Sequence, residues 1–169
     1  GEGVRRWRLN WNGEYLIFPY KRVNDEDVVI SEQEMMGKFP NTWSYFNLPE
    51  NKAALEAREY LMEKIRKGTR KEFYELWIPK NSQLFENPKI LTPDMSNESN
   101  FTYDELKYYV PTTGFVVVLK DKFRSKSWYL SFLGLLNSKT LEFYFKHKSP
   151  FNEGKYFRYS KSYIEHLPI

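Results

Sequence analysis

The chain has no cysteine among its 169 residues, so disulfide bonds and thiolate metal sites are excluded. Its apolar runs are short, and none reaches the length that a membrane-spanning helix requires. The first residues also lack the charged and apolar pattern of a signal peptide. These absences fit a reducing compartment, and we expect a cytoplasmic location.

Groups that carry catalysis are scarce as well. The histidines, His147 and His166, lie at no spacing that is typical of a metal site or a catalytic triad. No glycine-rich loop follows a predicted strand, which excludes the usual dinucleotide site. The sequence contains no Asn-Pro-Pro-Tyr-type tetrapeptide, with which amino-methyltransferases hold a target base. We therefore expect no catalytic residue, metal or cofactor in this chain.

Aromatic residues, in contrast, make up 18% of the chain, as 13 Phe, 13 Tyr and 5 Trp. Each buries a large area, so a chain with 41% hydrophobic residues can form a substantial core. The length fits one domain, which we expect to span residues 1–169. The opening Gly1-Glu2-Gly3, without a methionine, suggests a piece of a longer protein.

Strand signals occur along the whole chain. Asn12-Gly13 lies between two apolar segments, residues 4–11 and 15–20, and predicts a hairpin with Pro19 at the end of its second strand. Residues 115–119 are β-branched and continuous, so we expect a strand that is buried on both faces. Further short strands are expected at 28–30 and 89–91.

Helical periodicity is clearest from Glu50 to about Lys67, where Gly68 is a natural C-terminal cap. Two further helices are expected at 128–136 and 139–147, with Ser138 as the N-cap of the second. A further helical piece is expected at 69–76, and residues 101–109 fit either a strand or a helix. Irregular segments are expected at 21–25, 36–47, 79–87, 94–100, 121–127 and 149–154. Because strands and helices mix without βαβ alternation, we predict an α+β fold with small mixed sheets packed against several helices.

One pattern resembles the metal site of many restriction nucleases. Pro93-Asp94 followed by Glu105-Leu106-Lys107 fits a loose arrangement in which the carboxylates hold Mg²⁺ and the lysine lies beside the attacking water. That chemistry requires Asp94 at the start of a strand, with Glu105 and Lys107 on an adjacent strand. In a chain with 28% charged residues the pattern also arises by chance, and then Asp94 is a turn residue and the other two are solvated charges.

Basic residues give a net charge of +4 and a pI of about 9.0, which suit a nucleic-acid partner. They gather in residues 5–8, 66–71, 120–126 and 146–161. The cluster at 66–71 is explained by the end of a helix, where cations are favourable. In the segment 146–161, basic residues alternate with aromatics, so phosphate contact and base stacking are both open to it, as is ordinary core packing.

An ordered set of short motifs runs through nearly the whole chain. In order, they are Arg6-Trp7, Tyr15–Tyr20, a helix with Arg58, Trp77-Ile78-Pro79-Lys80, Pro88-Lys89-Ile90, Phe115–Leu119, Leu136-Asn137-Ser138 and Leu167-Pro168. Each motif alone is weakly specific. Their joint order resembles the TaqI-like C-terminal specificity domain of DNA methyltransferases and of fused restriction-modification enzymes. In such enzymes this domain recognises a sequence in double-stranded DNA, and another domain does the chemistry.

The resemblance implies that most of these motifs are scaffold and that DNA contacts fall on loops. We therefore expect contacts from residues chosen by charge and loop position, namely Lys21, Arg22, Lys80, Arg124, Lys126, Lys148, Asn152, Lys155, Arg158 and Lys161. The resemblance also implies an N-terminal methyltransferase domain in the same polypeptide, of the adenine-N6 type, which would bind S-adenosylmethionine. A fused nuclease would need Mg²⁺.

Three other functions stay open at this point. A nuclease using Asp94, Glu105 and Lys107 would cleave DNA with Mg²⁺ and would lose that activity in Asp94→Ala. A protein-interaction module would use surface Tyr and Trp residues and would show no salt-sensitive DNA binding. An RNA-binding domain would prefer single strands.

Overall fold

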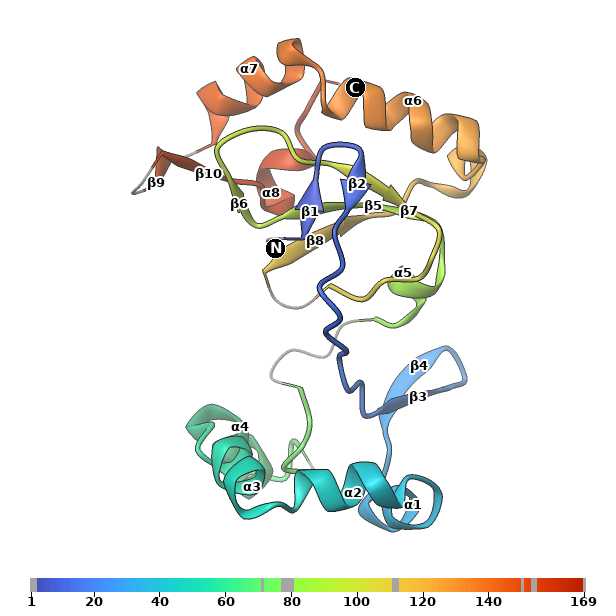
Figure 1. Cartoon of the computed structure of the whole chain (residues 1–169), viewed down its shortest axis with the longest axis vertical. Helices are drawn as coiled ribbons and strands as arrows, with labels where there is room; N and C mark the ends of the chain where they lie inside the picture. The colour runs from blue at the N-terminus through green and yellow to red at the C-terminus, as the bar shows by residue number, and fades with distance from the viewer. Residues whose placement is uncertain are drawn as a thin grey trace. The chain divides into compact units, whose positions relative to one another are not determined.

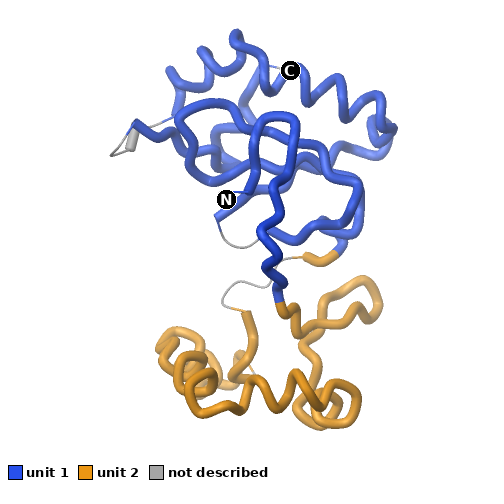
Figure 2. The backbone as a smooth tube through the Cα atoms, viewed as in Figure 1, with its two compact units in different colours: residues 1–16, 83–169 blue, residues 17–82 orange. Residues whose placement is uncertain are grey.

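The computed structural model describes residues 3–70, 72–76, 81–110, 113–149, 151–152 and 155–168, and for residues 151–152 it describes the backbone only. The chain divides into two compact units (Figure 2). Unit 1 comprises residues 1–16 and 83–169, and unit 2 comprises residues 17–82. Each unit combines helices with antiparallel strands, which confirms the predicted α+β class (Figure 1).

The centre of unit 1 is a three-stranded antiparallel sheet in the order β7-β5-β8. Its central strand β5 (Lys89–Pro93) pairs with β7 (Thr102–Asp104) and with β8 (Gly114–Val117). Every residue of β5 is buried, and successive side chains of a strand point to opposite faces. Ile90 and Leu91 accordingly belong to two different hydrophobic clusters, one on each face of the sheet.

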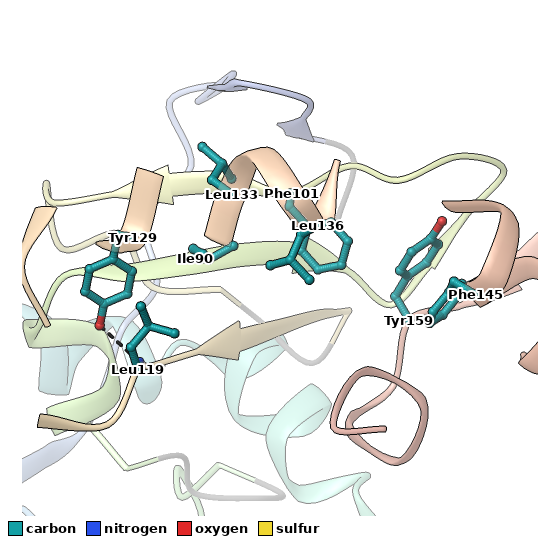
Figure 3. Close-up of a cluster of buried hydrophobic side chains, with 8 residues drawn as sticks. All are labelled: Ile90, Phe101, Leu119, Tyr129, Leu133, Leu136, Phe145 and Tyr159. Atoms are coloured by element: carbon teal, nitrogen blue, oxygen red, sulfur yellow. Dashed lines mark hydrogen bonds between the residues drawn. The ribbon is translucent and has the colours of Figure 1, made fainter. Parts of the chain in front are cut away.

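Two helices contribute to the cluster that contains Ile90. α6 (Lys126–Leu136) and α7 (Lys139–Lys148) are separated at Asn137-Ser138, and Ser138 Oγ accepts a hydrogen bond from Leu141 N–H, which confirms the predicted cap. The buried members of this cluster are Ile90, Phe101, Leu119, Tyr129, Leu133, Leu136, Phe145 and Tyr159 (Figure 3). This cluster is the main core of unit 1, and it holds α6 and α7 on the sheet.

The N-terminal hairpin and a short helix supply the cluster that contains Leu91. β1 (Val4–Arg5) and β2 (Arg8–Leu9) pair through a tight turn in which Trp7 has a φ of 74°. α5 (Gln83–Glu86) precedes β5. The buried members of this second cluster are Val4, Phe85, Leu91 and Val110.

A second three-stranded sheet, in the order β6-β10-β9, lies at the periphery of unit 1 (Figure 1). β6 (Met95–Ser96) follows closely after β5, and β10 (Tyr156–Arg158) pairs with it in antiparallel fashion. β9 (Phe151–Asn152) pairs with β10 on the other side. The remaining short helices of the unit are the 3-10 helix Asp121–Phe123 and α8 (Lys161–Ile164).

Unit 2 contains a hairpin followed by short helices. β3 (Tyr20–Val23) and β4 (Glu26–Val29) are joined by Asn24-Asp25, in which both residues have a positive φ. The helices are α1 (Glu32–Lys38), α2 (Pro40–Phe46), α3 (Pro49–Glu56) and α4 (Glu59–Arg66). Their buried core contains Ile30, Met35, Phe46 and Tyr74. No helix in the described part of either unit is long and apolar enough to cross a membrane.

The predicted N-terminal hairpin is wrong in position. Residues 10–19 form no strand, so Asn12-Gly13 does not join a pair. The two-residue hairpin turn is instead Asn24-Asp25, because Asn and Asp tolerate the left-handed conformation that such a turn requires. Residues 114–117 do form β8, but this strand is at the sheet edge and only partly buried; the strand buried on both faces is β5.

The helix predicted at 50–67 is two helices, α3 and α4, which meet at Ala57-Arg58. The Arg58 guanidinium donates to the carbonyl oxygens of Leu55, Phe73 and Glu75, at 2.9, 2.5 and 2.9 Å, and thereby stabilises the break. Gly68 has a φ of 69°, as its predicted capping role requires.

Several segments predicted to be irregular are regular. Residues 36–47 belong largely to α1 and α2, whose starts are provided by the Ser31 cap and by Pro40 at the first helical position. The described residues of 69–76, in contrast, form no helix. Short elements also occupy parts of the predicted loops, at 21–23, 83–86, 95–96, 121–123 and 151–152.

Candidate nucleic-acid interface

The β6-β10-β9 sheet has an exposed face that combines an aromatic, a basic and an apolar side chain. Tyr156 and Arg158 lie two residues apart on β10 and therefore point to the same side, and Met95 lies opposite Arg158 on β6. All three are exposed, whereas the intervening Phe157 packs against the main core. A β-ribbon with such side chains has suitable dimensions for the major groove of DNA.

Arg158 is held in place through both its backbone and its side chain. Its N–H donates to Ser149 Oγ at 3.2 Å, and the Ser149 hydroxyl donates to its carbonyl oxygen at 3.1 Å. Its guanidinium Nε donates to Asp94 Oδ1 at 3.2 Å. Asp94 is itself fixed, because its N–H donates to the Thr113 carbonyl and its own carbonyl accepts from Tyr159 N–H.

An open groove of about 1250 Å³ adjoins this face in unit 1. Its lining includes Tyr156 and Asp94, and also Trp11 and Tyr15, whose rings meet edge to face with centroids 5.2 Å apart. Exposed amide side chains in the groove are Asn10, Asn12 and Asn97. Amides can pair with the edge of adenine and aromatic rings can stack on bases, so the groove carries groups that can read a nucleic acid.

These groove residues were missed from the sequence. The polar composition of 94–100 and the Asn12-Gly13 signal were visible, but they indicated a loop and a hairpin. Only folding places the segment after the N-terminal hairpin beside residues 93–98 and Tyr156.

The structure brings together the predicted contacts that lie between residues 148 and 158. Lys148 ends α7, Asn152 belongs to β9, Lys155 precedes β10 and Arg158 ends it. Lys155 has a φ of 68°, which is typical of a turn. Lys148 was expected in a loop, yet it lies in the last helical turn, where a cation is favourable.

The start of α6 lies at the end of unit 1 away from β9 (Figure 1); Lys126 is its first residue, and Arg124 comes two residues before it. Arg124 donates to the Leu119 carbonyl at 3.0 Å and pairs with Asp121 at 3.0 Å. Lys126 is helical, contrary to the predicted loop, and its Nζ lies 2.7 Å from Glu105 Oε1. That hydrogen bond raises the pKa of Lys126 and lowers the pKa of Glu105, so both stay charged at neutral pH.

The remaining predicted contacts are Lys21 and Arg22, Lys80 and Lys161. Lys21 and Arg22 belong to unit 2 and lie on β3, not in the predicted loop. Lys21 pairs with Glu34, which lowers the pKa of that carboxyl. Lys161 starts α8 in unit 1 with a side chain that is 85% exposed. Lys80, and the Trp77-Ile78-Pro79-Lys80 motif that contains it, lie outside the described residues.

The nuclease pattern is contradicted by the strand register. Asp94 follows the C-terminal end of β5, whereas Glu105 follows Asp104, which pairs with Lys89 at the opposite end of β5. Five strand residues separate the two carboxylates by roughly 15 Å or more, far beyond what one metal ion can bridge. Their actual partners are Arg158 and Lys126, and Lys107 pairs with Glu86 at 3.1 Å.

Metal-ligating groups do not cluster in the part of the chain that the structure describes, where no three His, Cys, Asp or Glu side chains could hold an ion. His147 packs against the Phe143 ring, with centroids 4.2 Å apart, and its Nδ1 lies 2.8 Å from the Phe143 carbonyl. His166 lies 3.9 Å from Glu165 on the surface. Both contacts are ordinary surface packing.

Several of the motifs behind the family resemblance are scaffold in the structure. The Asn137 amide accepts from Phe101 N–H at 3.0 Å and donates to the Phe101 carbonyl at 2.9 Å, inside the protein. Arg6 donates to the Ser99 carbonyl at 3.0 Å and pairs with the buried Glu142 at 2.9 Å. These residues hold segments of unit 1 together.

Comparison with known proteins identifies the family of this chain. The chain matches the family model of the TaqI-like C-terminal specificity domain over residues 1–169, which include both units. It is also 25% identical over 162 residues to the type II methyltransferase M.BanIII of Aneurinibacillus aneurinilyticus, an alignment that covers 89% of this chain and 26% of that protein. The chain therefore spans about a quarter of the length of this relative. With the whole of its length matched, the chain belongs to the TaqI-like C-terminal specificity domain family.

Proposed function

We propose that this chain recognises a specific sequence in double-stranded DNA for a restriction-modification methyltransferase. The observation that carries the proposal is the family match over the entire chain. The exposed face of β6 and β10 and the adjoining groove support it, because they offer Arg, Asn, Tyr and Trp side chains to a ligand. Such side chains both contact phosphates and read base edges.

The chemistry would reside in a separate part of the parent enzyme. A type II methyltransferase relative about four times as long as this chain supports a catalytic part outside this chain. We propose, as the family resemblance implies, that it is an N-terminal domain of the same polypeptide and of the adenine-N6 type. That domain would bind S-adenosylmethionine, and a fused nuclease would bind Mg²⁺. In this arrangement the chain is not itself an enzyme, and its partners are duplex DNA and the catalytic domain. A cytoplasmic location stays a prediction.

Binding to mixed-sequence duplex DNA at two salt concentrations, with and without Mg²⁺, tests the proposal. Affinity should decrease steeply with salt, by about 0.9 in log–log slope for each phosphate that is neutralised. No cleavage should occur. Cutting that is lost in Asp94→Ala would favour a nuclease despite the distant carboxylates, and a preference for single-stranded RNA would favour an RNA-binding domain.

Exposed apolar side chains on α6 and α7 favour an additional protein interface. They are Trp128, Leu130, Leu135, Phe143 and Tyr144. Aromatic residues are enriched at interfaces, and Phe143 is 67% exposed. If the catalytic domain packs there, Trp128→Ser with Phe143→Ser should weaken capture of that domain and leave the salt slope of DNA binding unchanged. Loss of both properties would indicate a misfolded variant, which thermal unfolding would reveal.

A further inference from the structure

We propose that Arg158 reads a guanine in the major groove of the target sequence and that Asp94 is the residue that positions it. The inference rests on the proposed function and goes beyond it, because it assigns one base type to one side chain. Arg158 donates to Asp94 only through Nε. Among the residues that the structure describes, no partner takes its terminal Nη1 and Nη2 groups.

The geometry matches the hydrogen-bonding pattern of guanine. In the major groove guanine presents two acceptors, N7 and O6, side by side, and a guanidinium can donate to both at once. When Nε is bound to a carboxylate, Nη1 and Nη2 form the free end of the planar fork. The Arg158 side chain is 55% exposed, so this end is accessible, whereas the Asp94 side chain is only 20% exposed.

A base contact explains the carboxylate better than a phosphate contact does. A phosphate is held mainly by positive charge, and Asp94 places a negative charge beside the guanidinium. The same carboxylate restricts rotation of the guanidinium plane, which a two-point contact with a base edge requires. The Asp94 carboxylate therefore weakens the attraction of Arg158 for a phosphate and fixes the orientation of its guanidinium.

The surroundings of the pair are rigid as well. Ser149, which is buried, holds the Arg158 backbone by two hydrogen bonds, and the Asp94 backbone bonds to Thr113 and Tyr159. Residues that determine specificity need such support, since a loosely held side chain discriminates poorly.

Arg124 provides the contrast within the same unit. Its Nε is occupied by the Leu119 carbonyl, and its partner Asp121 is 90% exposed and only three residues away in the sequence. An exposed local pair of this kind contributes little orientation. Arg124→Ala is therefore the matched control for removal of a paired arginine.

The test is selection of preferred sites from randomised duplex DNA by the 169-residue chain and its variants. The wild type should select a site with at least one guanine that Arg158→Ala and Arg158→Lys no longer require. Loss of this two-point contact should reduce preference at that position about ten-fold or more, with other positions unaffected. Asp94→Ala should weaken the same preference, whereas Asp94→Asn should retain it, because an amide oxygen can still accept from Nε. Arg124→Ala removes a predicted DNA contact at a different part of unit 1, so it should lower affinity equally at all positions and keep the guanine preference.

A second measurement separates the base contact from general loss of affinity. Replacing the selected guanine by 7-deazaguanine removes N7, and it should weaken the wild type but cause no further loss in Arg158→Ala. An unchanged preference in Arg158→Ala, or a loss that is equal at all positions, would overturn guanine reading and leave DNA recognition standing. Absence of DNA binding by the wild type at low salt would overturn both proposals.

Discussion

Lys89 and Asp104 form an ion pair inside unit 1, with Nζ 2.5 Å from Oδ2 and the side chains 0% and 2% exposed. The two residues also face each other across β5 and β7. Lys89 donates in addition to the Phe85 carbonyl at 2.6 Å, and the Asp104 carboxylate accepts from the N–H groups of Leu106 and Tyr108. The pair thus joins the central sheet to α5 and to the segment after β7.

Breaking this pair should strongly destabilise the protein. Lys89→Met leaves the Asp104 carboxylate buried without its cation, and we expect a loss of about 3–5 kcal/mol in the free energy of unfolding. Urea denaturation measures the loss. The control is Lys107→Met, which breaks the surface pair with Glu86 and should cost about 1 kcal/mol or less. Equal losses in the two variants would contradict the buried role of Lys89.

Asn137 should be nearly as sensitive, because both halves of its buried amide bond to the Phe101 backbone. Asn137→Ala leaves two buried backbone groups unpaired, at a cost of about 2–3 kcal/mol. Asn137→Asp keeps the acceptor but turns an oxygen towards the Phe101 carbonyl, so it should not restore stability. For comparison, Ser138→Ala removes only the helix cap, at about 1 kcal/mol. Thermal unfolding of the variants ranks these losses, and a tolerated Asn137→Asp would show that the donor is not needed.

Tyr159 should make the protein sensitive to alkaline pH. Burial raises the pKa of Tyr159 to about 12, above the value of about 10 in an unfolded chain. Below pH 10 the Tyr159 hydroxyl is protonated in both states, and its stabilising contribution to the free energy of unfolding is complete. As pH rises from 10 towards 12, the hydroxyl ionises in the unfolded chain first, and the free energy of unfolding decreases by up to about 1.4 kcal/mol per pH unit. Urea unfolding of Tyr159→Phe between pH 9 and 11 should show a shallower decline than the wild type. Part of the slope should remain, since burial also raises the pKa of Tyr74.

Two glycines of unit 2 should respond in opposite directions to alanine. Gly68 has a φ of 69° after α4, and Gly68→Ala should destabilise by about 1 kcal/mol, because a Cβ disfavours this conformation. Gly37 lies inside α1 with nothing within 4 Å of an added Cβ, so Gly37→Ala should stabilise by up to about 1 kcal/mol. The difference in midpoint temperature between the two variants checks both signs. A stabilising Gly68→Ala would mean that α4 does not end at this turn.

Local signals in the sequence predicted the helices that depend on local interactions. The α6–α7 pair, the Ser138 cap and the Gly68 turn follow from periodicity and capping within a few residues. The break at Arg58 was not visible, because three carbonyls distributed over residues 55–75 create it. The Asn12-Gly13 hairpin failed for a similar reason: a turn signal does not specify whether its flanking segments find partners.

By itself, the sequence determined the α+β class and, through the order of its motifs, the family. Tertiary structure alone decided which charged residues act together. Strand register separates Asp94 from Glu105, so the two carboxylates cannot share a metal ion. Asp94 pairs instead with Arg158, which is 64 residues away in the sequence. Tertiary structure also places Asn10, Asn12 and Asn97 in one groove with Tyr156. The reason is physical: charge and hydrogen bonding act through space over a few ångströms, and only strand pairing and core packing bring residues that are distant in the chain within that range.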